Sequence, residues 1–188
     1  SPYALTMFSC HKLRVFFVSR HMSLVDACHY ATKDVILENV INIDTELRKI
    51  GIENPLIAVA GLNPHNGDHG LFGTEEITDI GPAVEEAKKR GINAVGPCPA
   101  DSVFHIGKSG KYDAILSLYH DQGHIACKTL DFEKSVTLTF GLPFIRSSVD
   151  HGTAFDIAGK GIANCVSLIE STKVVSEYAA KQHAKKEA

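Results

Sequence analysis

Short apolar runs alternate along the chain with longer segments in which apolar residues recur every three or four positions. The short runs are rich in β-branched and aromatic residues and end at polar or glycine-containing stretches, as buried strands do. Strands are therefore expected at residues 13–18, 56–60, 93–96, 113–119 and 135–140, and residues 145–149 are expected to be extended.

The longer segments predict helices, because their apolar spacing matches one face of a helix. Ser23 and Asp26 are suited to the start of a long helix, and Gly51 to its end in a left-handed conformation. Residues 97–101 (PCPAD) are expected to form a rigid connector, since each proline fixes its own backbone angle. Helices or helical turns are expected at residues 3–8, 24–50, 74–76, 82–90, 124–128, 154–158 and 165–181.

Strands that alternate with helices predict an α/β fold with a largely parallel sheet flanked by helices. At 188 residues the chain is long enough for about one domain with a buried core. Open sheets of this kind bind ligands outside the carboxyl ends of their strands.

Composition narrows the function classes. The net charge of −3 gives no reason to expect nucleic acid or an anionic membrane as a partner, and no apolar run approaches the roughly 20 residues of a membrane helix. The first residues lack the basic-then-apolar pattern of a signal peptide. The five cysteines are widely spaced without a C-x-x-C pair, which argues against disulfides or a cysteine zinc site and for the cytoplasm.

Three predicted strands each end in a polar stretch that contains a histidine: SRH at 19–21, GLNPHNGD at 61–68 and YHDQG at 119–123. If these strand ends converge, His21, His65 and His120 can bind one divalent metal through neutral imidazoles and leave coordination positions open for a substrate. The alternative is that all three are ordinary loop histidines.

Other polar residues each have a functional and a structural interpretation. Asp121 can orient the imidazole of His120 or cap a helix. Asp101 can pair with a base or a substrate amine, or cap a turn. Lys128 and Arg146 can hold phosphate or carboxylate, or form surface salt bridges. The glycines near residue 70 make no G-x-G-x-x-G fingerprint, so a standard Rossmann site is unsupported. Further polar candidates near glycines are His69, His124, Asp150 and His151.

Several motifs together resemble the 4-hydroxythreonine-4-phosphate dehydrogenases of pyridoxal phosphate biosynthesis, and the resemblance covers nearly the whole chain. They are GLNPH at 61–65, FGTEE at 72–76, GP at 96–97 with PAD at 99–101, YHDQG at 119–123, and GLPFIRSSVDHGTA at 141–154.

The resemblance implies an isocitrate/isopropylmalate-dehydrogenase-like fold and a homodimer with active sites at the subunit interface. It implies oxidation of a phosphorylated four-carbon hydroxy acid with NAD or NADP, followed by decarboxylation, and a divalent metal (Zn, Co or Mg) held by histidines supplied across the dimer.

Carried onto this sequence, the resemblance gives each candidate residue a role. The metal ligands would be His21, His65 and His120, and the catalytic residues Asp101, His120 and Lys128. The substrate would be bound by Lys128, Thr137 and Arg146, where Thr137 replaces an asparagine of the family pattern. The cofactor side would be formed by Asp150, His151 and Thr153.

Two departures shape the expected function. Family members are much longer at the N-terminus, so residues 1–188 are interpreted as the C-terminal portion of such an enzyme, with the N-terminal segment absent. His124, Ile125 and Thr137 look more like the sister branch that acts on D-threonate or D-erythronate 4-phosphate. A non-catalytic metal-binding and dimerisation module, or a metal-dependent hydrolase, are the alternatives from other classes.

Overall fold

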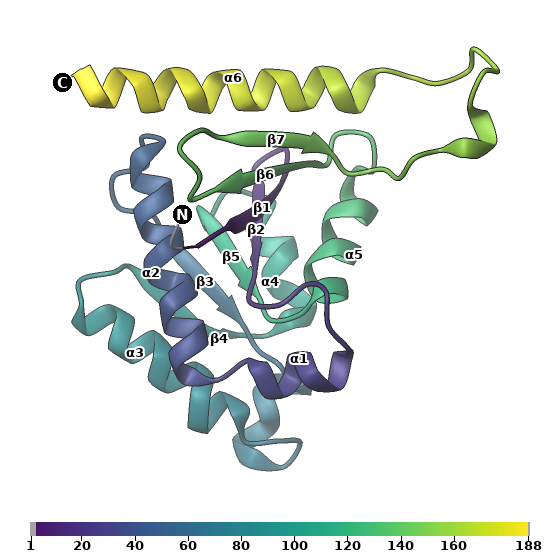
Figure 1. Cartoon of the computed structure of the whole chain (residues 1–188). Helices are drawn as coiled ribbons and strands as arrows, with labels where there is room; N and C mark the ends of the chain where they lie inside the picture. The colour runs from purple at the N-terminus through teal and green to yellow at the C-terminus, as the bar shows by residue number, and fades with distance from the viewer. Residues whose placement is uncertain (1–2, 188) are drawn as a thin grey trace.

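The computed structural model describes residues 3–187, of which 3–185 have described side chains. In this part of the chain a seven-stranded sheet forms the centre, in the order β4-β3-β5-β2-β1-β6-β7 (Figure 1). The strands are β1 Leu5–Cys10, β2 Leu13–Phe17, β3 Ile57–Ala60, β4 Ala94–Cys98, β5 Ala114–Ser117, β6 Val136–Phe140 and β7 Arg146–Val149.

Helices cover both faces of this sheet. They are α1 Leu24–Tyr30, α2 Lys33–Lys49, α3 Gly81–Lys89, α4 Ala100–Gly107, α5 His120–Leu130 and α6 Val166–Glu187. Shorter helical segments are η1 Pro64–Gly70, η2 Glu76–Ile80 and η3 Phe155–Ile157. No helix in residues 3–187 has an apolar stretch long enough to cross a bilayer.

The α/β prediction is confirmed, and the sheet has two parts. Strands β4, β3, β5 and β2 pair in parallel, whereas β1 pairs antiparallel with both β2 and β6, and β7 pairs antiparallel with β6. The direction of pairing therefore changes at β2. Since β6 runs in the same direction as β2, the carboxyl ends of β2, β3, β5 and β6 share one edge of the sheet.

Two separate cores lie on the two faces. One is formed with α2, α3 and α6, and contains Phe16, Ile43 and Leu138. The other lies under α4 and α5, and contains Phe8, Phe17 and Cys127. Full burial of a large apolar side chain contributes about 1.5–3 kcal/mol, so these two cores hold the helices on the sheet.

Three expectations from the sequence were wrong in their local structure. Residues 3–8 lie mainly in β1 and not in a helical turn, because β1 is buried on both sides and so lacks a polar alternation. The helix expected at 24–50 is two helices, broken where the Asp79 carboxylate accepts from Lys33 N at 2.9 Å. The connector at 97–101 is the end of β4 and the start of α4. The helical turn expected at 154–158 is present as η3, which is a single short turn.

Candidate functional site

Side-chain hydrogen bonds join three strand ends at the shared edge of the sheet. Ser19 Oγ, after β2, donates to the carbonyl of Leu118, after β5, at 2.9 Å. Gln122, in the first turn of α5, accepts from Leu118 N and donates to the carbonyl of Gly61, after β3, both at 2.8 Å. These bonds explain why the histidine-containing stretches lie at one edge.

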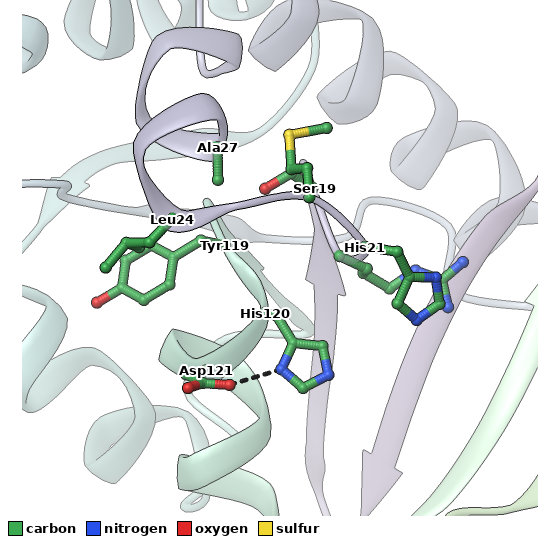
Figure 2. A pocket seen from close by; sticks show the side chains of 9 residues that line it. Ser19, His21, Leu24, Ala27, Tyr119, His120 and Asp121 are labelled. Atoms are coloured by element: carbon green, nitrogen blue, oxygen red, sulfur yellow. Dashed lines mark hydrogen bonds and ion pairs between the residues drawn. The ribbon is translucent and has the colours of Figure 1, made fainter.

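A cavity of about 350 Å³ opens at this edge, between the end of β2, α1 and the start of α5 (Figure 2). The rings of His21 and His120 lie with their centroids 6.4 Å apart. His120 Nδ1 is 2.6 Å from Asp121 Oδ1, and because a carboxylate only accepts, Nδ1 donates a proton to this bond and Nε2 is the nitrogen that has the free lone pair in the neutral ring. The polar lining comes from Ser19, Arg20, His21, Tyr119, His120 and Asp121.

His124 lies directly beneath His120. The two rings are stacked with centroids 3.7 Å apart and 9° between their planes, and the Nδ1–H of His124 donates to the carbonyl of His120 at 2.7 Å. The other side of His124 packs on Phe8 and Phe17, at 4.1 and 4.4 Å between centroids. Burial lowers the pKa of His124 to about 4, so His124 is neutral at pH 7.

Lys128 lies two turns further along α5, about 12 Å from His120 along the axis at roughly 1.5 Å per residue. Its ammonium is 3.4 Å from Asp150 Oδ2 and donates to the Asp150 carbonyl at 3.3 Å. Burial raises the pKa of Asp150, while the charge of Lys128 opposes that rise. Lys128 and Asp150, expected at the substrate and the cofactor, are therefore neighbours.

Thr137 and Arg146 lie on the same face of the sheet as α5. Thr137 is directly opposite Phe8, which packs on His124, and Arg146 is opposite Thr139, two positions further along β6. Arg146 is exposed at the start of β7, so the antiparallel register places it near the edge where β2, β3 and β5 end.

His65 lies in an unusual turn. Residues 65–69 of η1 all have positive φ, from 42° to 76°, a region that residues other than glycine seldom occupy. His65 itself is exposed. A run of this kind persists only where surrounding contacts determine it.

Glu76 lies outside the turn and bonds the residues that lead into it. Its side chain is 5% exposed, and Oε1 accepts from Leu62 N and Asn63 N, both at 2.7 Å. Its Oε2 accepts from Asn63 Nδ2 at 2.9 Å. The carboxylate therefore holds the loop that leads from β3 to His65.

The remaining candidates lie outside the cavity lining. Asp101 is exposed in the first turn of α4; η1 contacts this helix, and Asn66 Nδ2 donates to the Pro97 carbonyl at 3.1 Å. His151 and Thr153 are exposed in the segment after β7. These three positions remain predictions.

The three histidines do not converge within one chain. Among residues 3–187 no three His, Cys, Asp or Glu side chains are grouped to hold a metal; His21 and His120 are neighbours, whereas His65 contacts Phe72, with centroids 6.5 Å apart. Two imidazoles beside a cavity, one fixed by a carboxylate, are a suitable partial donor set for a divalent metal. The pair fits a site completed by a ligand from outside this chain.

Sequence reasoning left Arg20, Gln122 and Glu76 without roles. Arg20 is next to His21, and Gln122 is within the YHDQG motif, so proximity was an available signal for both. Glu76 ends the FGTEE motif at 72–76, but its role depends on backbone amides that folding brings to it, so the motif alone does not show that role.

Comparisons with known proteins agree with this architecture. The family model of the pyridoxal phosphate biosynthetic protein PdxA matches residues 1–175. A curated relative from Halalkalibacterium halodurans, assigned as a D-threonate 4-phosphate dehydrogenase, is 58% identical over 93% of this chain and 52% of its own length.

Solved structures give the same picture. The 4-hydroxythreonine-4-phosphate dehydrogenase of Klebsiella pneumoniae superposes with a TM-score of 0.85 at 43% identity, over 94% of this chain and 53% of its own. A β-decarboxylating dehydrogenase of Thermococcus kodakarensis, at 14% identity, shares the fold with a TM-score of 0.54 over 96% of this chain and 60% of its own.

The chain spans about half the length of the curated relatives it matches. The family model covers most of its residues, and the strand-end motifs that carry the resemblance lie together at one edge of the sheet. The chain therefore belongs to the family of the pyridoxal phosphate biosynthetic protein PdxA.

Proposed function

We propose that this chain is the metal-binding, C-terminal portion of a dehydrogenase that oxidises and decarboxylates 4-hydroxy-L-threonine 4-phosphate with NAD or NADP. The observation that supports this most directly is the pair of neighbouring imidazoles, His21 and His120, at the cavity where the strand ends meet. Relatives and structural neighbours named as dehydrogenases support the reaction class.

In this proposal His21, His120 and His65 hold the divalent metal (Zn, Co or Mg), with His65 supplied by a second copy in a homodimer. A divalent metal held by these imidazoles would supply Lewis-acid chemistry at the substrate hydroxyl. Asp121 keeps the Nε2 lone pair of His120 available for coordination.

The anionic groups of the substrate are assigned to Lys128, Thr137 and Arg146. Lys128 is held by Asp150 in this structure, so its ammonium is fixed on the α5 face. Asp150, with His151 and Thr153, forms the nicotinamide side in this scheme, and Asp101 contributes from the start of α4. We place the enzyme in the cytoplasm.

A second candidate is the D-threonate or D-erythronate 4-phosphate dehydrogenase reaction. It is favoured by the assignment of the relative at 58% identity and by His124 and Thr137. The chemistry at the oxidised carbon is the same, and the two substrates differ at C2, which carries an amine in one and a hydroxyl in the other.

The test is reduction of NAD⁺ and NADP⁺ by this chain with each 4-phosphate substrate and added Zn²⁺, Co²⁺ or Mg²⁺. Turnover with the amino acid supports the first function, and turnover with only the sugar acid supports the second. His120→Ala should abolish metal binding and turnover together, whereas the control His105→Ala, on the exposed side of α4, should change neither. Metal binding without nucleotide binding or turnover would instead indicate a non-catalytic module.

A further inference from the structure

Arg20 lies between Ser19 and His21 after β2, and its side chain lines two neighbouring cavities. One is the cavity of about 350 Å³ beside His21 and His120. The other, of about 240 Å³, is largely polar and is bounded by residues of β1 and α2, including Glu38 and Asn42. The guanidinium is therefore accessible to a small molecule at the sheet edge.

The charge of Arg20 is not balanced within the described residues. Its side chain is half-buried, and no carboxylate of the described residues forms an ion pair with it. Arg14 and Arg48, by contrast, donate to Tyr178 and to Asp44 at 2.9 and 2.8 Å. A guanidinium stays charged in proteins, and partial burial without a counter-ion is unfavourable unless a bound group compensates.

The other cations assigned to substrate binding do not line the cavity between His21 and His120. Lys128 is paired with Asp150, and Arg146 is on the exposed β6–β7 hairpin. Asp121 is within the cavity, but its carboxylate is bonded to His120. Arg20 is thus the guanidinium placed next to the two histidines.

We propose that Arg20 binds an anionic group, carboxylate or phosphate, of the ligand that reaches His21 and His120. The planar fork of a guanidinium matches two oxygens of either group. This subsite rests on the proposed function, because it assigns part of the same substrate. Arg20 would fix the end of the substrate that His21 and His120 do not contact.

The experiment compares wild type with Arg20→Gln and Arg20→Lys, with Arg90→Gln as the control because Arg90 is an exposed guanidinium bonded to Glu86 at the end of α3. Calorimetry on the full chain first measures the binding of Zn²⁺. It then measures the binding of inorganic phosphate and of D-glycerate in the presence of Zn²⁺. We expect Arg20→Gln to lower the affinity for one of these anions roughly tenfold to hundredfold. Arg20→Lys should lose less, and Arg90→Gln should behave as wild type. The anion whose affinity falls shows whether Arg20 binds a phosphate or a carboxylate group.

Zn²⁺ affinity separates this inference from the proposed function. A wild-type chain that does not bind Zn²⁺ contradicts the proposed function, and the anion comparison can still be made without metal. Unchanged binding of both anions in Arg20→Gln, or binding of neither by wild type, overturns the Arg20 subsite. If Arg20→Gln does not fold by circular dichroism, Arg20→Lys provides the comparison, and a wild-type affinity for both anions in that variant also overturns it.

Discussion

The imidazoles of His120 and His124 stack at 3.7 Å on consecutive turns of α5, with Phe8 and Phe17 behind the second ring. His120 is thus oriented by Asp121 at its edge and by His124 at its face. A metal-ligand candidate whose ring is held in this way requires little reorganisation when it binds.

His124 should make stability pH-dependent. Its pKa is about 4 in the folded chain and about 6.5 when unfolded. Above pH 6.5 both states are neutral at this ring, so it contributes nothing. Between pH 6.5 and 4 only the unfolded state takes up the proton, so stability falls with falling pH, by at most about 3 kcal/mol. Urea unfolding of chelator-treated wild type and His124→Phe should show the variant gaining relative stability over that window. Parallel pH profiles would contradict this account.

Removing the Glu76 carboxylate should release the loop that carries His65. Glu76→Ala leaves Leu62 N and Asn63 N without their acceptor, and the expected loss is about 3 kcal/mol in the free energy of unfolding. Glu75→Ala is the matched control, because the neighbouring Glu75 is less buried and its carboxylate accepts from one described side chain, the Asn63 amide. Urea unfolding should show a loss below about 1 kcal/mol for the control. Equal losses would show that Glu76 does not determine the turn.

Metal binding should be restored by mixing two defective variants. If His65 of one copy joins His21 and His120 of another, His65→Ala and His120→Ala each bind metal poorly alone. A mixed dimer contains one intact site, so equimolar mixing should recover Zn²⁺ binding to as much as one site per mixed dimer. Competition with a chromogenic chelator measures that recovery. The control is a mixture of His21→Ala and His120→Ala, which should recover no Zn²⁺ binding. If the mixture of His65→Ala and His120→Ala also fails to bind Zn²⁺, the site is not shared between two copies.

Gly123 should be intolerant of even one methyl group. A Cβ there would lie 2.6 Å from Phe17 Cε1 and 2.7 Å from both Ser117 Oγ and Val15 Cγ1. Helix propensity alone favours alanine by about 1 kcal/mol, but overpacking of about 1–3 kcal/mol should prevail. Thermal unfolding should therefore show a lower Tm for Gly123→Ala. Gly152→Ala, where a Cβ meets nothing within 4 Å, should be unchanged; a similar Tm for both would indicate that α5 can move away.

The sequence was sufficient to predict the elements whose signal is local. Strands β2, β3, β5 and β6 were found because apolar runs stop at polar stretches, and the start of α1 because Ser23 Oγ accepts from Asp26 N as a cap. The meeting of His21 and His120 followed from strand ends that share an edge.

The structural features that sequence reasoning missed depend on contacts between residues far apart in the chain. At the break between α1 and α2 the Asp79 carboxylate bonds Lys33 N, and the loop before the left-handed turn is bonded to Glu76. Burial of His124 depends on Phe8 from a strand that the pattern did not indicate. The third metal ligand depends, in our proposal, on a second copy, about which a single sequence has no local signal.

The left-handed run at residues 65–69 has a stereochemical consequence. An L-residue in this conformation costs roughly 1–2 kcal/mol, whereas its mirror image occupies its own favoured region. At the exposed positions His65, Asp68 and His69, a chain made by chemical synthesis with D-residues should relieve backbone strain. This chirality inversion, harmful in nearly any helix or strand, would here favour the native conformation of the turn that presents His65.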